Sequence, residues 1–171
     1  MRRLNEFVGD ERIYIDAGIF LEVLREGESG EECKEFLRKV EHGQVKGVIS
    51  PLVIDEVVFN LMMDILRPLS RSYREVLLRL KDEPELLDRT IPRLMEFMVI
   101  LEGMEGLEMV PCDEVLCLGI FHIIAEHRLL PRDSLHYGIM KLDGIHHIAT
   151  IDRDFTRIEG IEVWMPGLRS L

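Results

Sequence analysis

The sequence predicts an α/β protein: a three-layer α/β/α sandwich around a central, mainly parallel sheet of about five strands. Short apolar segments typical of buried strands alternate along the chain with longer segments whose apolar residues recur at helical spacing. Strands that alternate with helices in this way usually pair in parallel, and helices cover both faces of their sheet. A chain of 171 residues is long enough for one domain with its own core, so we expect a single domain over 1–171.

Two strands and three helices are expected in the first part of the chain. They are, in order, a strand at 11–16, helices at 17–25 and 31–42, a strand at 45–49 and a helix from 50 to about 66. Asp16 ends the first strand at a position suited to cap the following helix. Ser50 and Pro51 favour the start of the long helix, with Ser as its cap and Pro in its first turn.

The second part of the chain is predicted to contain four helices and three strands. The helices are expected at 70–81, 90–102 and 113–127 and from about Asp133 onward, and the strands at 107–110, 148–151 and 161–164. Pro68 should end or kink the preceding helix, because it has no backbone N–H and clashes with the previous turn. We therefore expect a helical excursion at about 67–103 that leaves the sheet and returns to it.

Composition narrows the classes to which the protein can belong. The longest stretch without Asp, Glu, Lys or Arg has eleven residues, at 115–125, whereas a membrane-spanning helix needs about 20 apolar residues. The first ten residues lack the apolar stretch of a signal peptide. We expect a cytoplasmic protein without a membrane partner. The three cysteines have no C-x-x-C spacing, which argues against a disulfide framework and a zinc site.

The polar composition has a bias reported for proteins from hot environments. Charged residues make up 31% of the chain, whereas it has one Gln and two Asn. A thermophilic source is therefore a hypothesis, and a melting temperature in the range of mesophilic domains would count against it.

The net charge of −11 would by itself repel a nucleic acid. The segment 67–81 is an exception, because it contains five basic residues and one acid. In it, Arg67, Arg71 and Arg74 follow one another at spacings of four and three, so we expect them on one helical face where they would bind phosphates. The alternative is a solvated face whose arginines pair with nearby acids.

Four acids are expected at one edge of the sheet. Asp16 and Asp152 come directly after strands, and Glu56 and Asp133 lie in the early turns of helices that start at the same edge. In an open parallel sheet the functional crevice lies outside the carboxyl ends of the strands. Carboxylates that converge there repel one another unless they take up protons or a cation, and oxygen ligands in this number select Mg²⁺ or Mn²⁺. Such a site suits phosphodiester hydrolysis by a metal-activated water.

Each of these side chains also has a purely structural interpretation. Asp16 can cap a helix, Asp133 can favour a helix dipole, and Glu56 can be a solvated helix residue. Asp154 supplies either a further metal ligand or a turn acid. Thr150 is a candidate to hold a carboxylate, a water or substrate through its hydroxyl, although Thr is also an ordinary strand residue.

Four short motifs resemble those of the PIN-domain ribonucleases, in the same order. They are Ile13-Tyr-Ile-Asp16-Ala-Gly, Ser50-Pro-Leu-Val-Ile-Asp-Glu56-Val, Asp133-Ser-Leu-His and Ala149-Thr-Ile-Asp152-Arg-Asp-Phe155. The resemblance implies a Mg²⁺- or Mn²⁺-dependent endoribonuclease that holds its ions through Asp16, Glu56, Asp133 and Asp152. It also implies frequent homodimers and, for many small members, the toxin role in a VapBC-type pair, whose small antitoxin blocks the acidic site.

The sequence departs from this family directly after the first acid. Members commonly have Asp-Thr-Asn or Asp-Ser-Ser there, whereas this chain has Asp16-Ala17-Gly18 and so lacks a hydroxyl or amide that could orient the carboxylate. This difference favours the alternative of a catalytically silent PIN-like scaffold that binds RNA or a protein. An acidic-pocket phosphatase is less favoured, because its D-x-D would follow the first strand rather than the fourth.

Overall fold

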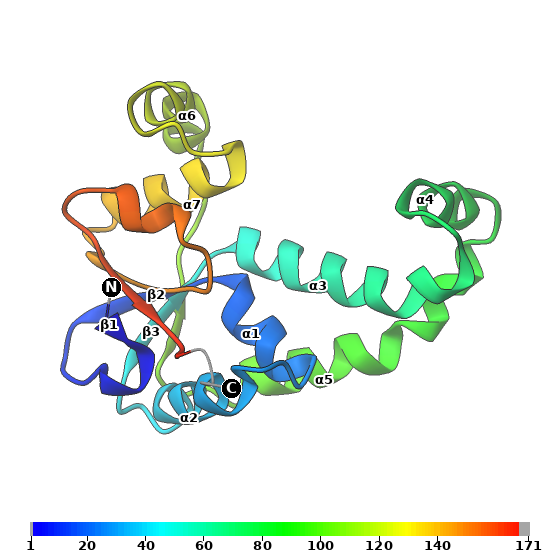
Figure 1. Ribbon diagram of the computed structural model, residues 1–171, viewed down its shortest axis with the longest axis horizontal. Coiled ribbons are helices and arrows are strands. Elements are labelled where there is room, and N and C mark those ends of the chain that lie inside the picture. Colours follow the sequence, from blue (N-terminus) through cyan, green and yellow to red (C-terminus); the bar gives the residue numbers. More distant parts are fainter. Residues whose placement is uncertain (1, 168–171) are drawn as a thin grey trace.

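The structure, a computed structural model that describes residues 2–167, is built on a six-stranded parallel sheet (Figure 1). Its strands are β1 (Arg2–Arg3), β2 (Arg12–Ile15), β3 (Lys46–Ile49), β4 (Leu107–Met109), β5 (His147–Ala149) and β6 (Glu162–Met165). They lie in the order β1-β6-β5-β2-β3-β4, and every neighbouring pair is parallel. The predicted fold class is confirmed. The sixth strand, β1, was not expected, because its two exposed arginines have no apolar pattern and it is recognisable only by its pairing with β6.

Helices lie on both sides of this sheet, α1 and α2 below it and α6 and α7 above it in Figure 1. The α-helices are α1 (Ala17–Leu24), α2 (Gly30–Glu41), α3 (Pro51–Leu66), α4 (Tyr73–Asp82), α5 (Ile91–Glu102), α6 (Glu114–His127) and α7 (Pro131–Leu142). Short 3₁₀ helices occur at Leu4–Glu6, Arg67–Leu69, Pro84–Arg89 and Asp154–Arg157. Each of the seven α-helices lies close to a range that the apolar spacing predicts.

The central strands β2 and β5 form the best-buried part of the sheet. Ile13, Tyr14 and Ile15 of β2 and Ile148 and Ala149 of β5 have no exposed surface. The pairing of these two strands continues one residue past β2, because the backbone N–H of Asp16 donates to the carbonyl of Ala149. The chain is therefore held firmly at the point where both strands end, which is the edge at which the candidate acids lie.

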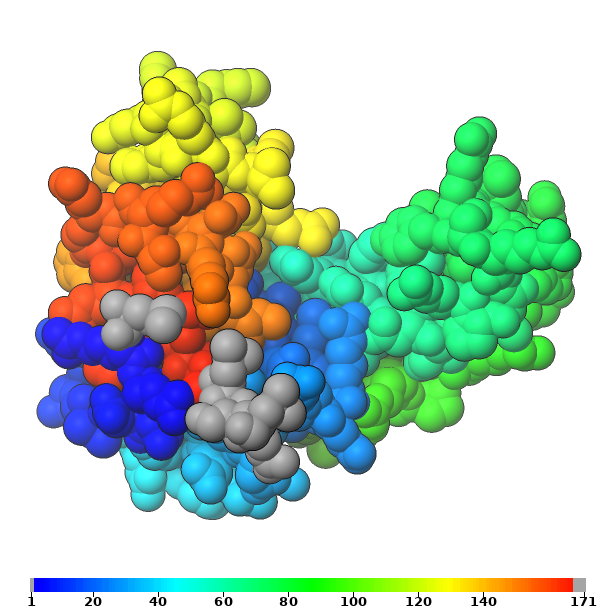
Figure 2. All heavy atoms as spheres, in the orientation of Figure 1, coloured from blue at the N-terminus to red at the C-terminus, as the bar shows by residue number. Residues whose placement is uncertain are grey.

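Residues 63–90, called the arm below, project from the sheet at the far end of α3 (Figure 1). The arm has a small core of its own, formed by Met63, Leu66 and Val76 with partly buried neighbours. Figure 2 shows a broad hollow between the arm and the α6–α7 side of the molecule, with α3 along its floor. The first turns of α3 lie at the sheet end of this hollow and its last turn at the arm end.

The expected single helical face for the three arginines of the arm is wrong. Helix α3 ends at Leu66, Arg67 lies in the 3₁₀ turn that contains Pro68, Arg71 lies in a bend, and Arg74 lies in α4. Proline ended the helix as predicted, but the bend at 70–72 then separates the arginines into three backbone segments. All three side chains are exposed.

Within residues 2–167, no helix is both long and apolar enough to cross a membrane.

Candidate functional site

Asp16 is fixed at the start of α1 by hydrogen bonds to both of its carboxylate oxygens. Its Oδ1 accepts from the backbone N–H of Ala17 at 2.9 Å, and its Oδ2 accepts from the hydroxyl of Thr150 at 2.7 Å. The expected helix cap is therefore present, and it uses one side of the carboxylate. The remaining lone pairs are available to a ligand.

Thr150 positions the acids and does not reach the surface. Its side chain is fully buried, its hydroxyl donates to Asp16, and its Oγ1 accepts the backbone N–H of Asp152 at 2.9 Å. Of the roles expected for Thr150, the one that these contacts confirm is holding a carboxylate. The expected contact with substrate is corrected, because the side chain has no exposed surface and its proton is already donated to Asp16. The residues directly after Asp16 in the sequence have no hydroxyl that could orient its carboxylate. Thr150, directly after strand β5, supplies this hydroxyl instead.

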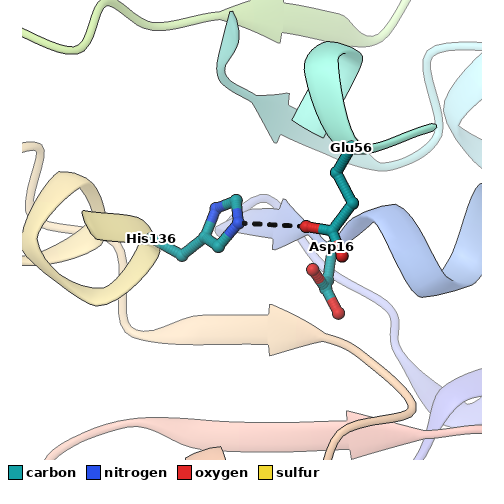
Figure 3. Close-up of side chains that lie close together, drawn as sticks. All are labelled: Asp16, Glu56 and His136. Atoms are coloured by element: carbon teal, nitrogen blue, oxygen red, sulfur yellow. Dashed lines mark ion pairs between the residues drawn. The ribbon is translucent and has the colours of Figure 1, made fainter. Parts of the chain in front are cut away.

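Glu56 reaches the site from the second turn of α3 and meets two basic groups. Its Oε2 lies 3.7 Å from Nε2 of His136 (Figure 3). The same oxygen lies 3.6 Å from Nη1 of Arg132. Arg132 also contacts Asp55 at 3.5 Å, so its charge is shared between two carboxylates. The neighbouring imidazole of His136 and then the guanidinium of Arg132 hold the pKa of Glu56 below its usual value, although partial burial opposes them.

The five predicted acids come together as two groups of possible ligands. One oxygen from each of Asp133, Asp152 and Asp154 lies within 4.8 Å of the others. A second group of the same width is formed by Asp16, Glu56 and a ring nitrogen of His136. The groups are close enough that the charges of Asp152 and Asp16 both raise the pKa of Asp133.

The electrostatics of the site favour a cation. Burial is the main reason that the pKa of Asp16 is raised, and the charge of Glu56 adds to it, although His136 and Thr150 oppose the shift. Burial also raises the pKa of Asp133, followed by the charge of Asp152. Raised pKa values mean that the folded protein resists full ionisation of these carboxyls, and a bound divalent ion would remove that resistance.

His136 is the residue of this site that the sequence did not identify. It lies in α7, within the motif that begins at Asp133, and it is 1% exposed. Its Nδ1 lies 2.7 Å from the hydroxyl of Tyr14, which in turn lies 2.7 Å from Oγ of Ser50. Ser50 is the N-cap residue of α3, as predicted, but its side chain makes no capping bond, and its hydroxyl contacts Tyr14 instead. The one available signal was the i, i+3 spacing that places His136 on the same side of α7 as Asp133.

Gly18, the unusual residue after the first acid, is required by a neighbour. A Cβ at this position would lie 2.6 Å from Cγ1 of Ile151 and 3.6 Å from Oδ2 of Asp16. A side chain there would collide with Ile151, so Gly18, two residues after Asp16, and Ile151, directly before Asp152, form a matched pair.

We predict that Gly18→Ser lowers the free energy of unfolding by about 1 to 3 kcal/mol through this overpacking. The double variant Gly18→Ser with Ile151→Ala should recover most of the loss, because Ile151 is 44% exposed and its truncation opens the space. Urea unfolding of the two single variants and the double variant measures the coupling. Additive losses would show that the two side chains do not compete for one space.

Comparison with known proteins agrees with this architecture. The sequence matches the family model described as the PIN domain over residues 13–161. The chain is 26% identical to Ribonuclease VapC2 of Methanocaldococcus jannaschii over 164 residues, which cover 95% of this chain and 98% of that protein.

Two solved toxin structures share the fold. The toxin VapC20 of Mycobacterium tuberculosis aligns with a TM-score of 0.58 at 14% identity, covering 88% of this chain and 98% of that one. A DNA-bound VapBC structure from Salmonella typhimurium aligns with a TM-score of 0.54 at 16% identity, covering 92% and 98%. The family match spans most of the sequence and includes every acid of the site. The chain therefore belongs to the PIN domain family.

Proposed function

We propose that this protein is a cytoplasmic, Mg²⁺- or Mn²⁺-dependent endoribonuclease and the toxin of a toxin–antitoxin pair. The observation that carries the proposal is the convergence of Asp16, Glu56, Asp133, Asp152 and Asp154 at the carboxyl edge of the sheet. The relative VapC2 is named a ribonuclease, and VapC20 is described as a toxin that cleaves the sarcin–ricin loop. Membership of the PIN domain family makes nuclease chemistry the reaction that best fits these acids.

The residues of the site fit a divalent cation. Asp133, Asp152 and Asp154 offer the carboxylate oxygens that Mg²⁺ and Mn²⁺ prefer, and Asp16 and Glu56 offer more beside them. An ion held there would acidify a water molecule and neutralise the charge that builds up on a phosphodiester. Thr150 would keep Asp16 and the backbone at Asp152 in place during the reaction.

Cleavage of single-stranded RNA tests this proposal directly. The purified wild-type chain should cut an internally labelled RNA at internal positions in the presence of Mn²⁺ or Mg²⁺ and should stop when EDTA is added. Exposed Glu159 provides a control, because Glu159→Gln removes a carboxylate outside the site and should leave the rate unchanged. If neither ion supports cleavage, the scaffold alternative is favoured instead.

The scaffold alternative rests on the absence of a hydroxyl at positions 17 and 18. The hydrogen bond from Thr150 to Asp16 weakens this alternative, since a hydroxyl already orients the Asp16 carboxylate. RNA binding without cleavage under both ions would still support it.

We propose that the arm contacts the RNA strand. Arg67 lies eleven positions after Glu56, directly past the end of α3, which corresponds to a rise of about 16 Å. A few nucleotides of single strand can bridge this length. Figure 2 shows that the hollow follows this path along α3. Within residues 2–167, the ion pairs of the arm and its neighbour α5 use other side chains. They are Arg25 with Asp64, Arg79 with Glu83 and Arg93 with Glu96, so Arg67, Arg71 and Arg74 remain available to phosphates.

Charge reversal tests the arm. Replacing Arg67, Arg71 and Arg74 with Glu should weaken RNA binding at least about tenfold at low salt and flatten its salt dependence, because fewer counterions are released. The matched control reverses three exposed basic residues elsewhere, Lys34, Arg38 and Lys46. RNA affinity should be measured by fluorescence anisotropy. If the two triple variants lose equal affinity, the loss is due to net charge and not to the position of the arginines.

We further propose that the protein is a homodimer that uses α6. Val115, Leu118 and Phe121 recur every three residues along this helix and are 63%, 73% and 70% exposed. An exposed apolar patch of this kind marks an interaction surface more often than a solvated one. Leu118→Glu with Phe121→Glu should halve the mass seen by analytical ultracentrifugation, whereas Val8→Glu with Met109→Glu, at exposed apolar positions elsewhere, should not. A monomeric wild type would refute the dimer.

The antitoxin is proposed from the structural relatives. The Salmonella typhimurium structure is a DNA-bound VapBC assembly, and a Klebsiella pneumoniae relative is described as a toxin–antitoxin complex. A small DNA-binding protein encoded beside this chain should form a complex with it and inhibit cleavage. A neighbouring product that neither binds nor inhibits would argue against the toxin role.

A further inference from the structure

One buried nitrogen atom in the site has an ion-pair neighbour but no hydrogen-bond partner. Nε2 of His136 is buried and has no hydrogen-bond partner among the described residues. Leaving a buried polar atom unpaired costs free energy, so each such atom in a folded protein requires an explanation. Figure 3 shows the imidazole pointing from α7 toward the carboxylates of Glu56 and Asp16.

The spacing around this nitrogen suits shared ligation better than a direct hydrogen bond. Nε2 lies 3.7 Å from Oε2 of Glu56, which is longer than a hydrogen bond. Two ligand atoms that each lie about 2.1 Å from one ion are separated by about 3 to 4.2 Å, depending on the angle between them. A ring nitrogen of His136 and an oxygen from each of Asp16 and Glu56 lie within 4.8 Å of one another, so small movements would close them around an ion.

The other side of the ring has the support that a metal-binding histidine needs. A ligating imidazole presents a lone pair at one nitrogen and usually donates the N–H of the other to an acceptor. Nδ1 of His136 can donate to the hydroxyl oxygen of Tyr14, and Tyr14 can in turn donate to Ser50. When the hydrogen bonds run in this direction, from His136 to Tyr14 to Ser50, the lone pair of Nε2 faces the acids. All three side chains are buried, so the ring orientation is fixed before a ligand arrives.

We propose that His136 is a nitrogen ligand of the divalent ion held by Asp16 and Glu56, and that it makes this site selective for Mn²⁺ over Mg²⁺. The inference deepens the proposed nuclease function and rests on it. Mn²⁺ accepts an imidazole beside its oxygen ligands, although it binds nitrogen less tightly than the later first-row ions do, whereas Mg²⁺ strongly prefers oxygen alone. The neighbouring group of Asp133, Asp152 and Asp154 offers only oxygen and would not discriminate in the same way.

Pulsed electron paramagnetic resonance of the metal-stripped full chain loaded with Mn²⁺ tests this assignment without measuring activity. An imidazole nitrogen bound to Mn²⁺ modulates the electron spin echo. The wild-type protein should show this modulation, His136→Gln should lose it while still binding Mn²⁺ through the carboxylates, and His147→Gln should retain it. His147 is the matched control, because it is also a buried histidine but lies in β5 beside Trp164.

Calorimetric titration supplies a second readout. His136→Gln should weaken Mn²⁺ binding by at least about tenfold and Mg²⁺ binding by less than about threefold. Tyr14→Phe keeps the imidazole but removes the acceptor for Nδ1, so it should retain nitrogen modulation and still weaken Mn²⁺ binding. If His136→Gln does not fold, the wild-type spectrum and the Tyr14→Phe titration still decide the question.

The outcomes separate this inference from the proposed function. Mn²⁺ binding without nitrogen modulation would overturn the role of His136, even if the protein cleaves RNA. Nitrogen modulation without RNA cleavage would support the ligand assignment and refute the nuclease. An unchanged preference between the two ions in His136→Gln would also overturn the inference.

Discussion

Asp16→Asn is expected to reduce metal-dependent RNA cleavage by at least about 100-fold, because loss of a metal ligand should cost no less than loss of the groups that orient it. Asn is nearly the same size as Asp, and its side-chain oxygen can still accept the N–H of Ala17 at the start of α1. The fold should therefore survive. The rate should be measured with both ions at saturating concentration, with Glu159→Gln as the control.

The same substitution should stabilise the metal-free protein at neutral pH. The pKa of Asp16 is raised mainly by burial, so ionising this carboxyl costs more in the folded chain than in the unfolded one. Asn removes that charge. An inactive variant that melts at a higher temperature than wild type in EDTA would identify Asp16 as a residue kept for function at the expense of stability. Undiminished cleavage by Asp16→Asn would refute the proposed chemistry, and a lower melting temperature would refute the electrostatic argument.

The five expected strands and the positions of the acids along the chain follow from local pattern, whereas strand β1 does not. An apolar run that ends in Asp places a carboxylate at the end of a parallel strand, which explains why Asp16 and Asp152 were found. Glu56 and Asp133 could be placed at the same edge because the helices that connect parallel strands begin there.

The features that were missed depend on partners distant in sequence. His136 is recognisable as part of the site only beside Tyr14 and Glu56, and a histidine in a helix gives by itself no sign of such neighbours. The role of Thr150 in holding a carboxylate was expected, but its burial against Asp16 was missed because it depends on the pairing of β2 with β5. The arginines of the arm were placed on one face because helical spacing continues in the sequence past the bend that separates them.

Adding Mn²⁺ to the metal-free protein is expected to raise its melting temperature by roughly 5 to 10 °C. An ion present at about 100 times its dissociation constant stabilises the folded state by about 2.7 kcal/mol, and each kcal/mol shifts the melting temperature of a domain of this size by about 2 to 4 °C. Differential scanning calorimetry with Mn²⁺ and with EDTA measures the shift. Asp16→Asn and Asp152→Asn should each reduce it, whereas Glu159→Gln should not.

The rise in melting temperature that Mn²⁺ causes should also shrink as the pH falls. Asp16 and Asp133 have raised pKa values in the folded protein, so they destabilise it at neutral pH, and this penalty disappears as they take up protons on the way down to their unfolded values. Glu56 has a lowered pKa and acts in the opposite sense, because its stabilising contribution is lost as the pH falls through its folded pKa. Protons and metal compete for the same oxygens. As the pH falls, the melting temperature with Mn²⁺ should therefore drop toward the melting temperature with EDTA. A shift that is constant from neutral to mildly acidic pH would place the bound ion away from these carboxylates.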